Sequence, residues 1–144
     1  MDTEVTYREL GIENSQTGPK TASVAFVIGE WLEYASGFLA PLAPATPVVG
    51  LNLTPVPATD ATNDLITFDG VNSTEDRFVM PVNGTIVNPV KAVGSGADVF
   101  SDSISLDATT IGTGTQFVIT QVIKAVADAY GLALVEVAVK LLAL

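Results

Sequence analysis

The sequence contains no cysteine and no histidine among its 144 residues. A chain without cysteine forms no disulfide and offers no thiolate as nucleophile or metal ligand. The lack of histidine also excludes the Ser–His and Cys–His catalytic pairs and the usual His/Cys zinc sites. Only carboxylate chemistry remains, so we expect a protein that is not an enzyme and that has no cofactor.

Positive charge is also scarce. Six Lys and Arg residues stand against 16 Asp and Glu, which gives a formal net charge of −10, and no basic residue lies between Lys20 and Arg77. Binding to nucleic-acid phosphates or to anionic lipids requires clustered basic side chains. We therefore expect neither nucleic acid nor membrane among the partners.

Targeting and membrane-spanning signals are missing from the two ends of the sequence. Residues 1–4 lack the basic and apolar regions of a signal peptide. The apolar segment 132–144 is interrupted by Glu136 and Lys140 and is too short to cross a bilayer as a helix. We expect a soluble protein.

The composition is rich in apolar residues and poor in charge. Hydrophobic residues make up 48% of the chain and charged ones 15%, well below the roughly 25% of an average soluble domain. A chain of this length forms one domain with a real core. With so few charges, part of the surface must be apolar, and such surface often contacts a partner.

Short apolar runs separated by turn residues begin at residue 22 and predict a mainly β protein, with a small β-sandwich or barrel-like fold. Tight turns are expected at Asp69-Gly70 and Asn83-Gly84, because both dipeptides tolerate positive φ. The Pro- and Thr-rich stretch 54–62 cannot hold a regular ladder. We expect strands over 22–28, 30–34, 38–42, 47–53, 65–68, 78–82, 85–90, 116–124 and 132–141.

The last of these strands carries the clearest pattern. Val135, Val137 and Val139 alternate on one face and are predicted to be buried. The segment 122–130 has a helical alternative, in which Gly131 would serve as the C-cap.

Residues 1–20 are polar and weakly patterned, and we interpret them as an extended N-terminal arm on a β-rich domain spanning 21–144. A disordered terminus without a role is the alternative. The arm has scattered apolar residues, and Val5 and Tyr7 alternate at the spacing that suits β-addition to an exposed edge. We predict that the arm contributes little to the core and that four of its residues bind a partner: Val5, Tyr7, Leu10 and Ile12.

The acidic residues allow two kinds of site to be considered. Glu30 and Glu33 are three apart, which on a strand places them on opposite faces and disfavours a facing glycosidase pair. Both are expected to be solvated. Asp98, Asp102 and Asp107 offer oxygen ligands for calcium, but their spacing differs from the EF-hand loop. We expect these three carboxylates to bind turn backbone groups instead, and we predict no metal site.

Aromatic residues gather near the start of the β region, at Phe26, Trp31, Tyr34 and Phe38. Core packing is the expected role, and a sugar-binding platform is the alternative. A platform requires exposed rings, so the exposure of Trp31 and Tyr34 distinguishes the two.

The stretch Val24–Pro41 reads VAFVIGEWLEYASGFLAP, and Val48-Val49-Gly50-Leu51 follows it. An acidic Thr/Asp loop, Phe117-Val118-Ile119-Thr120 and a closing Leu-Val-Glu-Val at 134–137 come later in the chain. This order of motifs resembles the tailed-bacteriophage head decoration proteins, also called capsid cement proteins. The resemblance covers roughly residues 22–140.

The resemblance implies a β-tulip-like structural protein on the outer surface of a virion, made in the host cytoplasm. Such a protein forms a homotrimer and clamps neighbouring subunits of the major capsid protein, which stabilises the shell. The family has no catalytic residues. Two other classes remain open: a carbohydrate-binding or adhesion module, such as a head fibre or surface domain, and a hydrolase that uses carboxylates alone.

Overall fold

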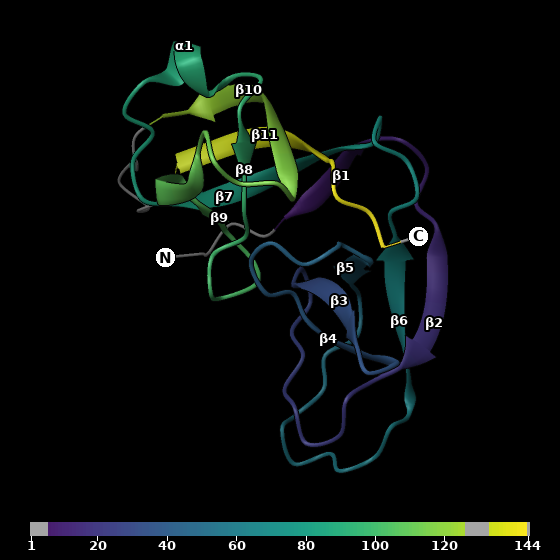
Figure 1. Cartoon of the computed structure of the whole chain (residues 1–144). Helices are drawn as coiled ribbons and strands as arrows, with labels where there is room; N and C mark the ends of the chain where they lie inside the picture. The colour runs from purple at the N-terminus through teal and green to yellow at the C-terminus, as the bar shows by residue number, and fades with distance from the viewer. Residues whose placement is uncertain (1–5, 126–132, 144) are drawn as a thin grey trace.

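The computed structural model describes residues 6–125 and 133–143, and most of its regular structure lies in two largely antiparallel sheets (Figure 1). The predicted mainly-β fold is confirmed. The described helices are a four-residue α1 (Pro89–Ala92) and the 3₁₀ turn η1 (Ala108–Thr110). No helix among the described residues is long and apolar enough to cross a membrane.

The first sheet forms the N-terminal barrel, which spans residues 15–70. Its strand order is β2-β6-β5-β3-β4, and its strands are β2 (Ser15–Pro19), β3 (Trp31–Ala35), β4 (Phe38–Pro41), β5 (Gly50–Asn52) and β6 (Leu65–Gly70). A parallel bridge between Lys20 and Leu39 joins the two edges of the sheet, with Thr21 N–H donating to Leu39 O at 2.9 Å. The sheet therefore closes on itself.

The interior of the N-terminal barrel is a small apolar cluster. Close approach of β2 to β4 requires a small residue, since a Cβ on Gly18 would lie 3.0 Å from Cδ1 of Leu39. At one end Lys20 is almost fully buried, and its Nζ donates to Thr62 O at 2.6 Å. The buried apolar residues are Phe26, Leu32, Leu39, Val49, Ile66 and Phe68.

The second sheet forms the C-terminal barrel, built from residues 77–125 and 133–139 together with β1. The strand order is β1-β7-β11-β10-β8, with β9 beside β7. An antiparallel bridge between Val99 and Leu106 links the end of β8 to β9, so this sheet also closes. Its strands are β1 (Tyr7–Leu10), β7 (Arg77–Asn83), β8 (Gly96–Ala97), β9 (Leu106–Asp107), β10 (Phe117–Lys124) and β11 (Ala133–Val139).

Inside the C-terminal barrel the predicted alternation of the last strand is confirmed. Val135, Val137 and Val139 are fully buried. They pack with Phe78, Met80 and Val82 of the neighbouring β7, which also turns alternate residues inward. Residues 122–124 belong to β10, so the helical alternative does not hold there, and residues 126–132 lie outside the described residues.

Trp31 joins the two barrels into one body. It is the first residue of β3, yet its ring lies in the core of the C-terminal barrel, edge-on to Phe78 and Phe117 at centroid distances of 5.0 and 5.1 Å. The Trp31 backbone N–H donates to Ser103 O at 2.7 Å. A side chain from one barrel therefore closes the end of the other.

Gln116 makes a second connection between the barrels. It is fully buried, and its Oε1 accepts a hydrogen bond from Val99 N–H at 2.8 Å. Its Nε2 donates to the carbonyls of Ala43 and Thr46 at 2.7 Å each. Because a buried amide left unpaired is costly, this bonding fixes the loop after β4 against the C-terminal barrel.

Three of the predicted elements are wrong. Residues 22–28 form no strand and contribute only a bridge between Phe26 and Val56. Asp69-Gly70 is no turn, because both residues continue β6. Asn83-Gly84 does end β7, but residues 85–90 lead into α1 instead of a second strand. β3 and β4 form a hairpin through Ser36 and Gly37, with positive φ at both positions.

The expectation for residues 1–20 also needs correction over residues 6–20. β1 pairs with β7 and β2 pairs with β6, so this segment supplies one strand to each sheet. Its polar character misled the prediction, because β1 is an edge strand whose side chains are largely exposed. The backbone hydrogen bonds, not apolar side chains, attach it to the body. Residues 1–5 lie outside the described residues.

Candidate interaction surfaces

The first candidate surface is the outer edge of β1. β1 ends the strand order of its sheet, and among the described residues it pairs only with β7. Tyr7, Leu10 and Ile12 are 56%, 59% and 89% exposed. Three of the four predicted partner-binding residues are thus exposed: Tyr7 and Leu10 in β1, and Ile12 two residues after it. Val5 lies outside the described residues. We name these three residues the β1 edge.

Arg8 holds the β1 edge in place. Its Nε and Nη2 donate to the two oxygens of Asp69 at 2.9 and 2.8 Å, and its Nη1 donates to Asp76. The hydrogen bond to Asp69 leads the effects that raise the pKa of Arg8 above its ordinary value. The guanidinium also lies 4.8 Å from the centroid of the Phe78 ring. β1 is therefore fixed to both barrels, which is the opposite of a free arm.

The second candidate surface lies at the end of the C-terminal barrel remote from the N-terminal barrel, where α1 projects (Figure 1). Val87 and Val90 are 93% and 88% exposed, and Val93 is half-exposed. We call residues 84–95 the tip. The sequence carried a signal for α1, since Asn88 followed by Pro89 is a typical N-cap and first helical residue, and Asn88 Oδ1 does accept from Lys91 N–H at 3.2 Å.

A pocket of about 500 Å³ opens beside these valines. Its walls come from the tip and from the segment that includes η1. The apolar lining is Ile86, Val87, Ala92, Ala108 and Ile111, and Lys91 and Ser95 are among its polar residues.

The two glutamates near β3, Glu30 and Glu33, do not act together in one site. Glu30 is buried, and from the described residues its Oε1 accepts one long hydrogen bond, 3.3 Å, from Val27 N–H. Burial raises the pKa of Glu30 to about 7. The expectation that Glu30 is solvated was wrong, because Glu30 directly precedes β3 at the junction of the barrels and is buried there. Glu33 instead accepts from Ala43 N–H at 2.5 Å.

The three aspartates considered for calcium each cap a turn, as expected. Asp98 accepts from Thr115 and Gln116 N–H groups. Asp102 binds the Ile104 and Ser105 N–H groups, and Asp107 binds Thr109. Within residues 6–125 and 133–143 no group of three or more acidic side chains is placed to hold a metal ion.

A second acidic contact lies on the outer face of the C-terminal barrel. The carboxyls of Glu9 and Glu136 share a hydrogen bond, which raises the pKa of Glu9. Thr120 Oγ1 donates to Glu136 at 2.6 Å and is the leading cause that lowers the pKa of Glu136.

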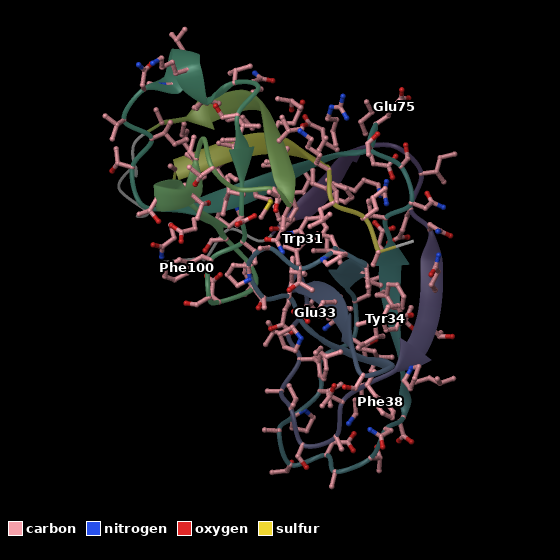
Figure 2. The ribbon with its side chains drawn as sticks, in the orientation of Figure 1. Trp31, Glu33, Tyr34, Phe38, Glu75 and Phe100 are labelled. Atoms are coloured by element: carbon pink, nitrogen blue, oxygen red, sulfur yellow. The ribbon has the colours of Figure 1, made fainter. Side chains whose placement is uncertain are left out.

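Figure 2 shows Trp31 at the junction of the barrels and Tyr34 and Phe38 on the N-terminal barrel. Trp31 and Phe26 are fully buried, whereas Tyr34 is 47% exposed. Trp31 therefore cannot stack on a sugar. Tyr34 borders a second pocket of about 470 Å³ with Thr46, Pro47, Leu142 and Ala143, and it is the one residue of the two that an aromatic sugar site could use.

Comparison with known proteins gives no relative. No family model matches the chain, and neither the curated proteins nor the solved structures contain a match.

Proposed function

We propose that this protein is a capsid decoration protein that binds the outside of a tailed-phage head. It contacts neighbouring major capsid subunits and stabilises the shell. The observation that carries the proposal is the exposure of apolar side chains at two separate places, the β1 edge and the tip, on one fixed body. Large apolar side chains left this exposed are typical of protein contact surfaces.

A clamp must transmit force between the subunits it touches, so its own parts must not slide. Trp31 and Gln116 fix the N-terminal barrel to the C-terminal barrel through buried packing and hydrogen bonds. Arg8 fixes the β1 edge to Asp69 of β6. These contacts support a rigid clamp, since well-packed interiors deform little.

We further propose that the protein acts as a homotrimer on the shell. A cyclic trimer closes its contacts and so prevents the open-ended pairing that the free edge of β1 would otherwise allow. Sedimentation equilibrium, alone and with shells, measures this state. A strict monomer in both settings contradicts the trimer.

The proposal is tested by co-sedimentation of the purified protein with expanded, DNA-free heads of the phage whose genome encodes it. We expect saturable binding and heads that withstand a higher temperature or denaturant concentration before they break. Unexpanded shells serve as the matched control and should bind more weakly. Absence of binding to expanded heads contradicts the proposal.

A carbohydrate-binding or adhesion module is the second candidate, and it depends on Tyr34 and the pocket beside it. If this candidate holds, Tyr34→Ala abolishes retention on immobilised polysaccharide without changing the melting temperature. Under the decoration proposal the same variant binds heads as the native chain does.

A further inference from the structure

We propose that the pocket at the tip binds an acidic–apolar segment of a partner protein, with an apolar side chain in the pocket and its neighbouring carboxylate on Lys91. This inference rests on the proposed docking function and adds the chemistry of the partner segment. The occupant is defined by two features of the pocket, an apolar wall and one cation without a partner.

Two hydrogen bonds fix the backbone of Lys91. Its N–H donates to Asn88 Oδ1 at 3.2 Å, and its carbonyl accepts from Ser95 Oγ at 2.8 Å. Within the described part of the chain its ammonium makes no ion pair or hydrogen bond. Because the backbone of Lys91 is already fixed, pairing with an anion has to order only its side chain.

The other basic side chains show that this is unusual in the protein. Arg8 binds two aspartates, Lys20 is buried against Asp60, and Arg77 donates to backbone carbonyls of the preceding loop. Lys124 also makes an interaction. The side chain of Lys140 makes no ion pair or hydrogen bond within the described residues, and it lies outside the pocket lining. Lys91 is therefore the basic residue that a bound anion in the pocket would meet.

Charge around the pocket favours an acidic occupant over a neutral or basic one. The protein carries a net charge of −10, yet residues 77–97 contain Arg77 and Lys91 and no acidic residue. Asp107 precedes Ala108 of the pocket wall, but its carboxylate is turned to the N–H and hydroxyl of Thr109. Lys91 is thus the one charged residue of the tip (residues 84–95), whereas the protein as a whole is acidic. An acidic segment is therefore repelled less at the tip than elsewhere on the protein.

The size and lining of the pocket fit the apolar part. A volume of about 500 Å³ falls in the range of small-ligand sites and accommodates one or two branched side chains. Val87 also lines the pocket, and Val90 directly precedes Lys91 in the sequence; both valines are almost fully exposed. A partner segment seated in the pocket would cover these valines and remove their apolar surface from water.

The test is a titration of the full chain, followed by amide NMR shifts, with small probes that carry the two features. N-acetyl-leucine supplies a branched apolar group and a carboxylate, and N-acetyl-leucinamide lacks the charge. We expect both to shift the amides of Ile86, Ala92 and Ile111, with the carboxylate about two- to fivefold tighter, as an exposed ion pair predicts. N-acetyl-glycine, which lacks the apolar group, should bind more weakly than either.

Lys91→Gln should reduce the affinity of the carboxylate probe to that of the amide, and added salt should do the same. Lys140→Gln, the matched control, should leave the preference intact. Equal affinities for the two leucine probes, or shifts outside the tip, overturn the inference. Co-sedimentation with phosphatidylcholine vesicles in the absence of probe binding overturns it too, since the valines would then enter lipid. Failure of the probes with intact binding to heads refutes this site and leaves the decoration proposal standing.

Discussion

At the scale of single residues, buried charge governs how stability depends on pH and on substitution. Glu30 and Arg8 are the two charged side chains where the structure makes the strongest statements. Glu30 accepts one long hydrogen bond from the described residues, and the Arg8 guanidinium forms ion pairs with two carboxylates. Neither role is visible in the sequence, because both depend on partners that are distant along the chain or on burial.

Glu30 should make the protein less stable as the pH rises from about 4.5 to about 7. Burial raises the pKa of Glu30 from the ordinary 4.5 to about 7. The folded state therefore keeps a proton that the unfolded chain releases near pH 4.5, and this stabilisation is lost by about pH 7. We expect a loss on the order of 1–3 kcal/mol. Urea unfolding of the native chain and of Glu30→Gln across this range measures it.

The glutamine variant is the control for all other titrating groups. Its stability should vary less with pH in this window, because the amide does not ionise. Identical pH profiles for the two proteins would show that Glu30 is hydrated and ordinary.

Arg8→Met should destabilise the protein by about 3 kcal/mol. The substitution leaves the carboxylates of Asp69 and Asp76 partly buried without their cation, and breaking one partner of a buried pair is costly. Arg77→Gln is the matched control, because Arg77 is half-buried and its hydrogen bonds go to loop carbonyls instead of to buried carboxylates. It should change the free energy of unfolding by less than about 1 kcal/mol. Equal effects of the two variants would contradict the role of Arg8 in holding β1 to Asp69 and Asp76.

At the scale of strands, the two most regular elements were predictable and the loops were not. β10 and β11 follow the alternation of apolar residues because one face of each is buried in a barrel. The apolar run 22–28 misled, since only Phe26 of its large side chains enters the core while Val27 and Ile28 are about half exposed. Asp69-Gly70 continues a strand because Arg8 and the Asn14 N–H bind the Asp69 carboxylate there.

Val137→Asp should cost several kcal/mol in stability, since it places an unpaired charge in the core of the C-terminal barrel. Val87→Asp makes the same chemical change at a side chain that is 93% exposed and should leave the melting temperature nearly unchanged. Thermal unfolding of both variants is the measurement. If Val137→Asp melts with the native chain, the register of β11 is wrong.

In β1, the backbone pairing and Arg8 are expected to stabilise the fold, whereas the exposed side chains are expected to bind a partner. Deletion of residues 1–10 removes Arg8 and the strand that pairs with β7, so it should lower the melting temperature strongly. The triple change Tyr7→Ser, Leu10→Ser and Ile12→Ser alters only exposed side chains and should cost less than about 1 kcal/mol. The same triple change should weaken binding to expanded heads at least tenfold, about 1.4 kcal/mol. Unchanged binding of the triple variant would remove the β1 edge from the contact.

At the scale of the whole molecule, two small closed barrels act as one body. The sequence predicted a mainly-β protein, but it did not predict two closures, because these depend on bridges between single residues, Lys20 with Leu39 and Val99 with Leu106. It also placed Tyr7, Leu10 and Ile12 among partner-binding residues, and they are exposed. The tip was not predicted from the sequence, because Val87 and Val90 were assigned to the strand expected over 85–90.

The most direct measurement of the central claim is a cryo-EM difference map between expanded heads with and without the bound protein. The decoration proposal predicts added density on the outer surface at the three-fold and quasi-three-fold positions. Each density should fit three copies of the double barrel, with the β1 edge or the tip against a major capsid subunit. No added density, or density confined to the tail or to a fibre, would contradict the account.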